Sequence, residues 1–307
     1  MASPVDHVRG VIIVFPWLAW VFIVDVLLSA LLPFLPFVPD VCYNISSALA
    51  ESGWAWIQLI FTNANGAVIT DSGDALPRGE SAIVVANHVG WSDFYMIQAL
   101  AMRVGMLGRC RYFAKTQLKW VPFLGWGLWA LGMPLISRRW DRDQKELDRV
   151  FAGIVERRWP TWLVSFSEAT RYTPAKYQDS MAWCTEHNRP QPQHLLYPRT
   201  KGFVTTVKHL RKAPQVKAVY DLTIAYEKGS KFQIPPSMWE TLSVARLSDR
   251  KNGKGYRFHV HVRRFPLVEL PTKDDELAKW LETRWVEKGI WLEQKRLEWA
   301  ESQAELK

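Results

Sequence analysis

The sequence has little cysteine and none of the usual nucleic-acid motifs. Its three cysteines, Cys42, Cys110 and Cys184, are too few and too widely spaced for a disulfide framework or a zinc site. There is no RNP-type motif, no Cys/His finger and no long run of Lys and Arg, although the formal net charge is +9. We therefore expect no nucleic-acid partner. A basic surface of this kind suits an anionic lipid or a phosphorylated small molecule.

Sets of metal-binding residues are also absent. His259 and His261 are of the right type, but histidines that alternate with valine are more typical of a half-exposed strand than of a metal site. We expect no metal ion, no cofactor and no specific protein partner. The chain also lacks internal repeats and low-complexity tracts.

Tryptophan and long apolar runs, by contrast, are abundant. Seventeen tryptophans occur in 307 residues, and tryptophan favours membrane–water interfaces because its apolar ring carries a polar N–H. Residues 11–24 and 26–39 are almost wholly apolar and flank Asp25. Up to Leu32 they predict a helix about 33 Å long, enough to cross the hydrocarbon core of a bilayer.

A second apolar stretch, Trp54–Phe61, ends a helix that we expect to begin at about Val41. The two helices predict a hairpin that anchors the protein to a membrane. Asp25 disfavours a simple span, because a mid-helix Asp costs about 2.5–3.5 kcal/mol. The helices either span the bilayer or lie partly sunk in one leaflet, with Asp25 facing the partner helix. A cleaved signal peptide is disfavoured because residues 1–10 carry no net positive charge.

The middle of the chain alternates between strand-like and helix-like segments, which indicates an α/β architecture with helices flanking a central mixed sheet. We interpret the polar segment Tyr172–Gln193 as a long loop. The expected strands are Ala82–Ala86, Met133–Ser137, Thr161–Phe166, His194–Tyr197, Ala218–Tyr226 and Arg257–Arg263. The expected helices are Asp93–Val104, Leu118–Leu131, Asp143–Arg158 and Thr200–Arg211.

The segment Ser81–Asp93 holds the main candidate for catalysis. A short apolar strand delivers Asn87 and His88 to its end, and Asp93 follows five residues after the histidine, at the start of a helix. On one continuous helix the two side chains would lie about 140° apart, so His88 must sit in the preceding loop, where Gly90 permits a bend. A carboxylate that accepts from one imidazole nitrogen leaves the other free to take a proton. Alone, the spacing fits a structural loop histidine and an N-capping aspartate at least as well.

Three further sequence blocks favour the catalytic interpretation of His88 and Asp93. The four blocks occur in the order Asn87-His88-x4-Asp93, Gly132-x3-Ile136-x-Arg138, Phe166-Ser-Glu168-Ala-Thr170-Arg171 and Leu196-Tyr-Pro198-Arg-Thr-Lys201-Gly-Phe. The chain resembles the 1-acylglycerol-3-phosphate acyltransferase family over residues 82–271. The resemblance implies a glycerolipid acyltransferase-like fold and transfer of a fatty acyl group from acyl-CoA, a substrate, to a lysophospholipid. It also implies a membrane location, in the endoplasmic reticulum or a related endomembrane.

The resemblance implies roles for particular residues. His88 would be the general base and Asp93 the residue that orients it. The remaining candidates would bind the substrates. Arg171 and Arg138 are candidates to bind the acceptor phosphate. Glu168 would hold Arg171 in place or accept hydrogen bonds from the acceptor hydroxyls. Lys115 and Lys119 would face anionic headgroups or the phosphates of CoA. Thr170 belongs to the same third block.

The third block departs from the family pattern at Ser167, where proline is usual, and at Ala169, where glycine is usual. If Ala169 takes a positive φ, its Cβ costs of order 1 kcal/mol. A serine hydrolase that uses Ser167 is a weaker hypothesis, because no G-x-S-x-G elbow surrounds it.

Other hypotheses also stay open at this point. An enzyme that remodels lysophosphatidylinositol or lysocardiolipin is the alternative within the class. A non-catalytic membrane adaptor that keeps the fold is the alternative outside it.

The C-terminal segment begins with a capping threonine and three acids, the pattern of a helix N-terminus. Its apolar stripe could pack on the domain or lie along the membrane, and Gly289 is a point where the helix would break or shift. We expect three parts: anchoring helices in 1–66, an acyltransferase domain in 67–271, and an amphipathic helix in 272–307.

Overall fold

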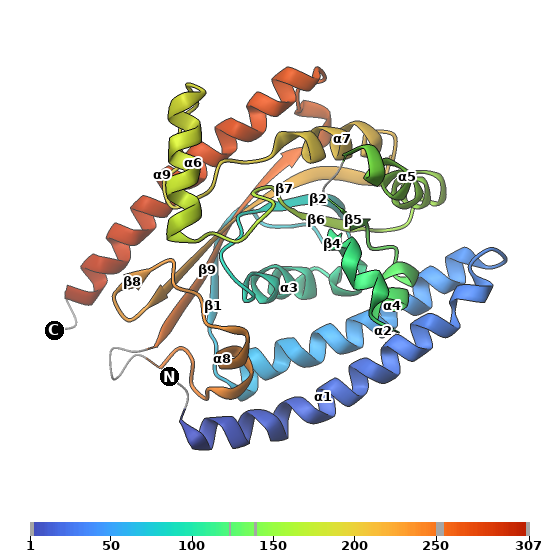
Figure 1. Ribbon diagram of the computed structural model, residues 1–307, viewed down its shortest axis with the longest axis horizontal. Coiled ribbons are helices and arrows are strands. Elements are labelled where there is room, and N and C mark those ends of the chain that lie inside the picture. The colour runs from blue at the N-terminus through green and yellow to red at the C-terminus, as the bar shows by residue number, and fades with distance from the viewer. Residues whose placement is uncertain (1–2, 123, 138–139, 250–254, 305–307) are drawn as a thin grey trace.

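The computed structural model describes residues 3–122, 124–137, 140–249 and 255–304. Its centre is a mixed sheet, confirming the predicted α/β architecture (Figure 1). The strand order is β1 (Ile69–Gly73), β9 (Tyr256–Pro266), β7 (Val216–Lys228), β2 (Ser81–Ala86), β6 (Trp162–Phe166) and β3 (Cys110–Tyr112). The short strand β8 (Lys231–Phe232) pairs with the end of β7, and β4 (Ala114–Lys115) pairs with β5 (Leu135–Ile136) in a separate ladder.

The central strands run parallel, whereas β9 runs antiparallel to its neighbour β7. β2 pairs in parallel with both β6 and β7, and β3 pairs in parallel with β6. Beyond β7, the antiparallel β9 is followed by β1, which is parallel to β9. Every residue of β2 is buried, as expected for a central strand covered on both faces.

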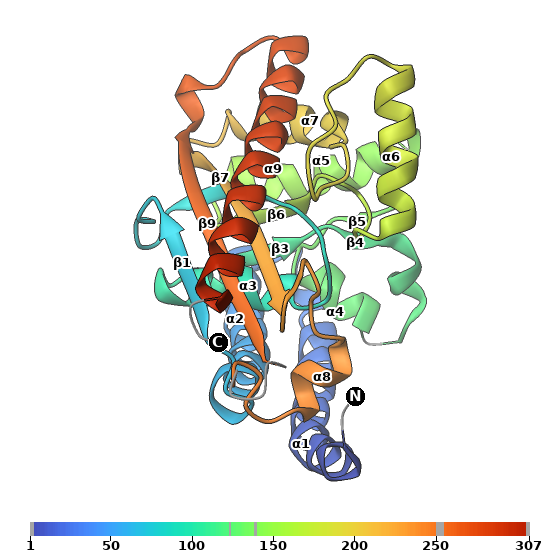
Figure 2. The same cartoon turned by 90° about the vertical axis from the view of Figure 1, so that its left-hand side faces the viewer.

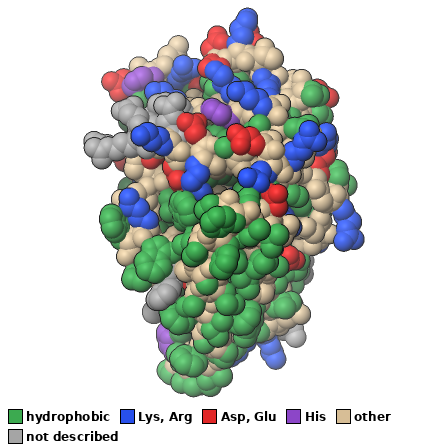
Figure 3. All heavy atoms as spheres, turned by 90° about the vertical axis from the view of Figure 1, so that its right-hand side faces the viewer, with side chains coloured by type: hydrophobic (Ala, Val, Ile, Leu, Met, Phe, Trp, Pro, Cys, Tyr) green, Lys and Arg blue, Asp and Glu red, His purple; other side chains and the backbone are tan. Residues whose placement is uncertain are grey.

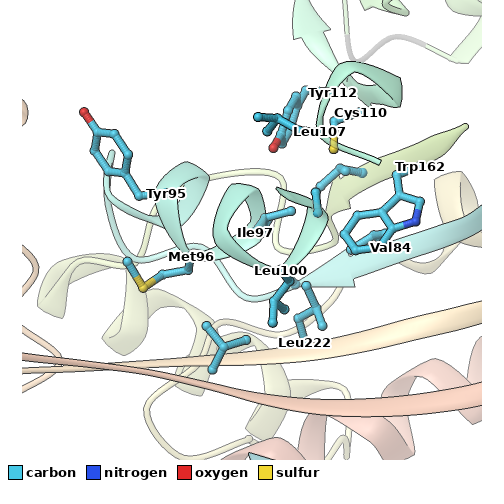
Figure 4. Close-up of a cluster of buried hydrophobic side chains, with 14 of the residues drawn as sticks. Val84, Tyr95, Met96, Ile97, Leu100, Leu107, Cys110, Tyr112, Trp162 and Leu222 are labelled. Carbon is cyan, nitrogen blue, oxygen red and sulfur yellow. The ribbon is translucent and has the colours of Figure 1, made fainter. Parts of the chain in front are cut away.

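Helices cover both faces of the sheet (Figures 1 and 2). Because side chains alternate along a strand, Val84 and Ala86 face one core while Ile83 and Val85 face the other. The first core lies against α1 (Pro4–Ala30), α2 (Pro39–Leu59) and α3 (Asp93–Arg103). The second lies against α5 (Trp140–Arg157), α7 (Thr200–Leu210) and α9 (Asp274–Ala304). Figure 4 shows the α3 side chains Met96, Ile97 and Leu100 near Val84 and Leu222 of the sheet.

The N-terminal apolar segments form the predicted pair of helices. Ser3 caps α1 through a capping box, and α1 continues through Pro16. α1 packs against α2, against α4 (Leu124–Ala130) and against α8 (Met238–Ser243). The expectation that Asp25 faces α2 is wrong. Asp25 lies against α4, where a Cβ added at Gly127 would be 2.7 Å from the Asp25 carboxylate.

The C-terminal helix α9 packs on the sheet rather than standing apart from the domain. Its buried face contains Leu277, Leu281, Trp285 and Leu292. The helix neither breaks nor shifts at Gly289. The glycine is needed for packing instead, since a Cβ there would lie 2.6 Å from the backbone nitrogen of Gln193. The domain boundaries after residues 66 and 271 stay predictions.

Some local predictions were wrong. The expected loop at Tyr172–Gln193 contains α6 (Pro174–Glu186), which begins with proline in its first turn and is capped by Thr173. No strand forms at His194–Tyr197, where His194 has a φ of 61° that no regular strand tolerates. The helix expected at Leu118–Leu131 is divided into a 3-10 turn, Thr116–Trp120, and α4.

Candidate active site

The first and third blocks leave neighbouring strands at the same level. Ala86 of β2 is paired with Phe166 of β6, and each is the last residue of its strand. Asn87 and His88 therefore emerge beside Ser167 and Glu168. The carboxyl ends of parallel strands are where α/β sheets place their ligand sites, so the topology brings the two blocks to one edge.

His88 and Asp93 are in direct contact, as the sequence predicts. The Nδ1 atom of His88 lies 2.7 Å from Oδ2 of Asp93. The histidine side chain is 13% exposed, whereas the aspartate is fully buried as the first residue of α3. His88 sits in the loop and Asp93 in the first helical turn, which is the arrangement that the five-residue spacing requires.

The Asp93 carboxylate has donors on both oxygens. Oδ2 also accepts from the backbone N–H groups of Val89 at 2.7 Å and Gly90 at 3.0 Å. Oδ1 accepts from the hydroxyl of Tyr226, on β7, at 2.7 Å. Burial and the adjacent Asp93 carboxylate raise the pKa of Tyr226, so the phenol stays a donor. Four donors therefore hold this carboxylate in one orientation.

The orientation of the His88 ring is fixed from a second side. Its ring stacks on Phe166, with centroids 4.1 Å apart and planes 16° from parallel. Because Asp93 accepts at Nδ1, the proton of a neutral ring sits there and Nε2 keeps its lone pair. Among the described residues no group bonds to Nε2. The ring can therefore take a proton at that atom.

The loop between strand and helix is tied to the sheet. The Asn87 amide donates to the carbonyl of Ile224 at 3.0 Å and accepts from its N–H at 2.7 Å, so it continues the ladder between β2 and β7. The chain bends at Gly90, as predicted, and the glycine is also needed for space. A Cβ there would lie 2.7 Å from Pro235, and its φ is not positive.

The third block forms a tight turn beside the histidine. Ala169 has a φ of 56°, the strained conformation considered for this position. The backbone N–H of Tyr172 donates to the carbonyl of His88 at 2.7 Å. Likewise, the N–H of Arg199, in the fourth block, donates to the carbonyl of Ser167 at 2.7 Å. Backbone hydrogen bonds thus join the first, third and fourth blocks.

Glu168 is the unusual residue of this turn. Its side chain is buried, and burial raises the pKa of its carboxyl to about 8. The backbone N–H groups of His88 and Leu196 and the indole of Trp285 oppose that rise, yet neither carboxyl oxygen has a hydrogen bond of regular geometry within the described residues. Burying a carboxyl group without hydrogen-bond partners costs free energy, so Glu168 is a candidate to bind a ligand.

The other predicted residues lie at the rim. Arg171 is exposed, and its guanidinium has no partner in the part of the chain that the structure describes. The Thr170 hydroxyl accepts from Lys176 of α6 at 2.6 Å, and the same ammonium group donates to the Arg171 carbonyl at 3.2 Å. Lys176 is not among the residues predicted from the sequence, because a loop is expected where α6 forms.

The remaining candidates belong to the neighbouring two-stranded ladder. Lys115 is exposed on β4 and paired with Ile136 of the second block. Lys119 is exposed too, with its ammonium 4.9 Å from the ring of Trp120. Arg138 lies outside the described residues. The functional roles of all these side chains stay predictions.

The histidine pair away from the site has partners of its own. His259 lies 2.7 Å from the Thr70 hydroxyl and 2.8 Å from that of Ser72, and Ser72 also contacts His261 at 3.0 Å. Both rings stack on Trp291. Across the described part of the chain no group of three or more metal-binding side chains forms. This pair therefore serves the packing of β9 against β1 and α9.

Comparison with known proteins identifies the family of this chain. A family model described as acyltransferase matches residues 68–227, slightly more than half of the chain, and a model described as acyltransferase C-terminus matches residues 252–294. The chain therefore belongs to the acyltransferase family.

Named relatives are about a third identical to this chain over the aligned residues. The 1-acyl-sn-glycerol-3-phosphate acyltransferase delta of Homo sapiens is 34% identical over 74% of this chain and 56% of its own length. The 1-acyl-sn-glycerol-3-phosphate acyltransferase 2 of Arabidopsis thaliana is 30% identical over 81% of this chain and 62% of its length. An uncharacterised acyltransferase of Schizosaccharomyces pombe is 30% identical over 75% and 62%. The chain thus spans about 60% of the length of these relatives.

Among solved structures, a 1-acyl-sn-glycerophosphate acyltransferase from Thermotoga maritima is 16% identical. The match covers 88% of this chain and 96% of that chain, with a TM-score of 0.45. This likeness is too low to add to the family assignment.

Proposed function

We propose that this protein transfers a fatty acyl group from acyl-CoA to the free hydroxyl of a lysophospholipid. The acceptor we favour is 1-acylglycerol-3-phosphate, which would give phosphatidic acid. Membership of the acyltransferase family supports the reaction class. The observation that carries the proposal is the 2.7 Å contact between a partly exposed His88 and a fully partnered Asp93 at the edge of the sheet.

The proposed chemistry begins with proton transfer to His88. An alcohol is a poor nucleophile at neutral pH, so Nε2 takes its proton as the oxygen attacks the thioester carbonyl. Asp93, anchored by its other donors, stabilises the imidazolium that forms. The tetrahedral intermediate then collapses: the C–S bond breaks, the ester C–O bond remains, and the proton passes to the CoA thiolate.

The acceptor is proposed to bind along the third block. Arg171 presents an exposed guanidinium at the rim, which suits two-pronged binding of a phosphate. Glu168 lies deeper and can accept from glycerol hydroxyls once it is ionised. Thr170 and Lys176 are hydrogen-bonded to each other next to Arg171. Lys115 and Lys119 are then left to face the phosphates of CoA or of the bilayer.

The N-terminal helices are proposed as the membrane anchor. The segment Pro4–Phe34 is long and apolar enough to cross a membrane, judged by length and composition alone. Figure 3 shows hydrophobic side chains gathered over the lower part of one face, with Lys and Arg side chains above them. On α1, Ile12 is 67% exposed and Phe15 is 71% exposed.

We favour partial insertion into one leaflet over a span. Arg9 donates to Asn65 and to the carbonyls of Ala64 and Ser243, and Asp25 lies against α4. If α1 crossed the bilayer, most of the helix would leave the domain and these contacts would break. A helix that lies in the membrane–water interface keeps them. Carbonate-washed membranes should retain the wild type, and Ile12→Glu/Phe15→Glu should move much of it to the soluble fraction. Recovery of intact wild type in that fraction would contradict the anchor.

The reaction is tested with the full chain in membranes, labelled acyl-CoA and a panel of lysolipids. We expect the highest turnover with 1-acylglycerol-3-phosphate. Preference for lysophosphatidylinositol or lysocardiolipin would make the protein a remodelling enzyme of the same class. The absence of acyl transfer to any lysolipid would leave the adaptor hypothesis, and loss of activity in Ser167→Ala with His88 intact would favour the hydrolase.

A further inference from the structure

The C-terminal helix carries a lysine that is fully buried beneath the site. Lys288 of α9 is 1% exposed, and its ammonium lies 2.5 Å from Oδ1 of Asp221 and 2.5 Å from the carbonyl oxygen of Leu222. A buried charge is unfavourable unless it is paired and hydrogen-bonded. The mechanism above gives this lysine no task, so its position needs a separate explanation.

The β7 segment that Lys288 holds is the one beside the histidine loop. Leu222 is paired with Ala86, the last residue of β2. Two residues further along β7, the backbone of Ile224 makes two hydrogen bonds with the amide of Asn87, the residue that follows β2. Lys288 of α9 and Asn87 of the histidine loop thus both bind the same stretch of β7. Its continuation carries the tyrosine whose hydroxyl holds the Asp93 carboxylate.

The same face of α9 also lies against the third block. The ring of Trp285 is 5.0 Å from the Lys288 ammonium. Its buried indole N–H lies close to the Glu168 carboxyl, and neither group has a regular hydrogen-bond partner among the described residues. One turn further on, Gly289 allows the backbone of Gln193 to approach the helix. α9 therefore packs against the third block and against the segment that leads into the fourth block.

The charges around Glu168 determine how easily it ionises. Burial raises the pKa of the Glu168 carboxyl most, and Asp93 on α3 raises it further. Tyr172, just after the turn, also lies close enough to interact with it. Lys288 on α9 also interacts with this carboxyl, and its own charged or titratable neighbours are Asp221, Arg263 and His261. Removing the positive charge would make Glu168 harder to ionise.

We propose that Lys288 is a positioning residue for acyl transfer: it fixes β7 beside the histidine loop, and its ammonium lies against the ring of Trp285, whose indole N–H lies close to Glu168. This inference rests on the proposed function, because it assumes that ionised Glu168 receives the acceptor. It assigns to the C-terminal helix a part in the site, in addition to its part in the core.

The test compares Lys288→Met with Lys288→Arg in the full chain in membranes. We expect Lys288→Met to lower kcat/KM for 1-acylglycerol-3-phosphate about tenfold at pH 7 and to move the acidic limb of the pH profile upward by about one unit. Lys288→Arg should restore most of the activity. Lys279→Met, exposed on the same helix, is the matched control and should change neither quantity.

A second readout does not depend on activity. In the wild type, the Tm of purified protein should fall as pH rises and should level off near pH 8. In Lys288→Met the fall should continue to a higher pH, and in Glu168→Gln it should be absent. If Lys288→Met does not fold, Lys288→Met/Asp221→Asn removes both buried charges and is measured instead.

The outcomes separate the two proposals. Coincident pH profiles and coincident Tm curves for Lys288→Met and the wild type would overturn the role of Lys288, as would an equal loss in Lys288→Met and Lys288→Arg with no shift in pH. A wild type that transfers no acyl group would overturn the proposed function, and the unfolding curves would then decide on Lys288 alone.

Discussion

The two halves of the site differ in how completely their carboxylates are partnered. Both oxygens of Asp93 are in use before any substrate arrives, with four donors on one carboxylate. In the described structure around Glu168, both carboxyl oxygens and the Ser167 hydroxyl are buried without regular hydrogen bonds. We call the first half, around Asp93, the preorganised half and the second, around Glu168, the unpartnered half; in the proposed function the first serves proton transfer and the second binds the acceptor. In this account, the residues that transfer the proton follow β2 and the residues that bind the acceptor follow β6.

The largest effect should come from breaking the preorganised half. Asp93→Asn keeps the shape but cannot accept from His88, Tyr226 and two backbone N–H groups as a carboxylate does, so the histidine loses its orientation. We expect kcat to fall by at least about 10²-fold. Tyr226→Phe removes one donor of four and should cost about tenfold or less. Equal losses in the two variants would contradict the view that His88 depends on the carboxylate itself.

The next effect concerns the stability of the unpartnered half. The folded-state pKa of Glu168 is about 8, above its ordinary 4.5, so its contribution to stability is present below pH 4.5 and is lost as pH rises through 8. In Glu168→Gln this loss should disappear, and at about pH 8.5 the variant should be more stable than the wild type by on the order of a few kcal/mol. Calorimetry from about pH 5 to 9 measures this, and parallel curves would show that Glu168 is not protonated in the fold.

Arg171 tests whether the second half recognises phosphate. Arg171→Ala should raise KM for 1-acylglycerol-3-phosphate about tenfold to a hundredfold, the loss of about 1.5–3 kcal/mol from a charged hydrogen bond. Its kcat should change little, because the guanidinium is remote from the reacting atoms in this account. Arg189→Ala removes an exposed arginine that pairs with Glu282 and serves as the control. An unchanged KM would remove Arg171 from the acceptor site.

The smallest effect tests strain in the same turn. Ala169→Gly relieves the positive φ, and after the entropy that glycine loses on folding we expect a gain of about 0.5–1 kcal/mol. Ala182→Gly in α6 should instead cost about 1 kcal/mol, because that residue is helical. Urea unfolding distinguishes the two signs. A loss in both variants would mean that the turn is not strained at Ala169.

Much of the preorganised half could be predicted from the sequence because its partners are local. His88 and Asp93 lie five residues apart, and an apolar strand and a helix pattern flank them. Tyr226 could not be predicted, since its contact with Asp93 depends on the register of β7 against β2, 133 residues along the chain. Long-range pairing of this kind leaves no periodic signal in the sequence.

The errors in the fold have similar causes. The segment Tyr172–Gln193 is polar and contains prolines and so suggests a loop, although Thr173 and Pro174 mark a helix start. Gly289 suggested a break in α9, but buried side chains on both sides of it hold the helix straight. The buried Lys288 could not be distinguished from an exposed lysine, because only the tertiary fold brings Asp221 to it.

The most direct test compares His88→Ala with wild type in acyl transfer from labelled acyl-CoA to 1-acylglycerol-3-phosphate, with His187→Ala, exposed at the end of α6, as the control. The account predicts a fall in kcat of about 10²–10⁴-fold for His88→Ala, with Tm and membrane retention unchanged, and full activity for His187→Ala. A folded, membrane-bound His88→Ala protein that transfers acyl groups at the wild-type rate would contradict it.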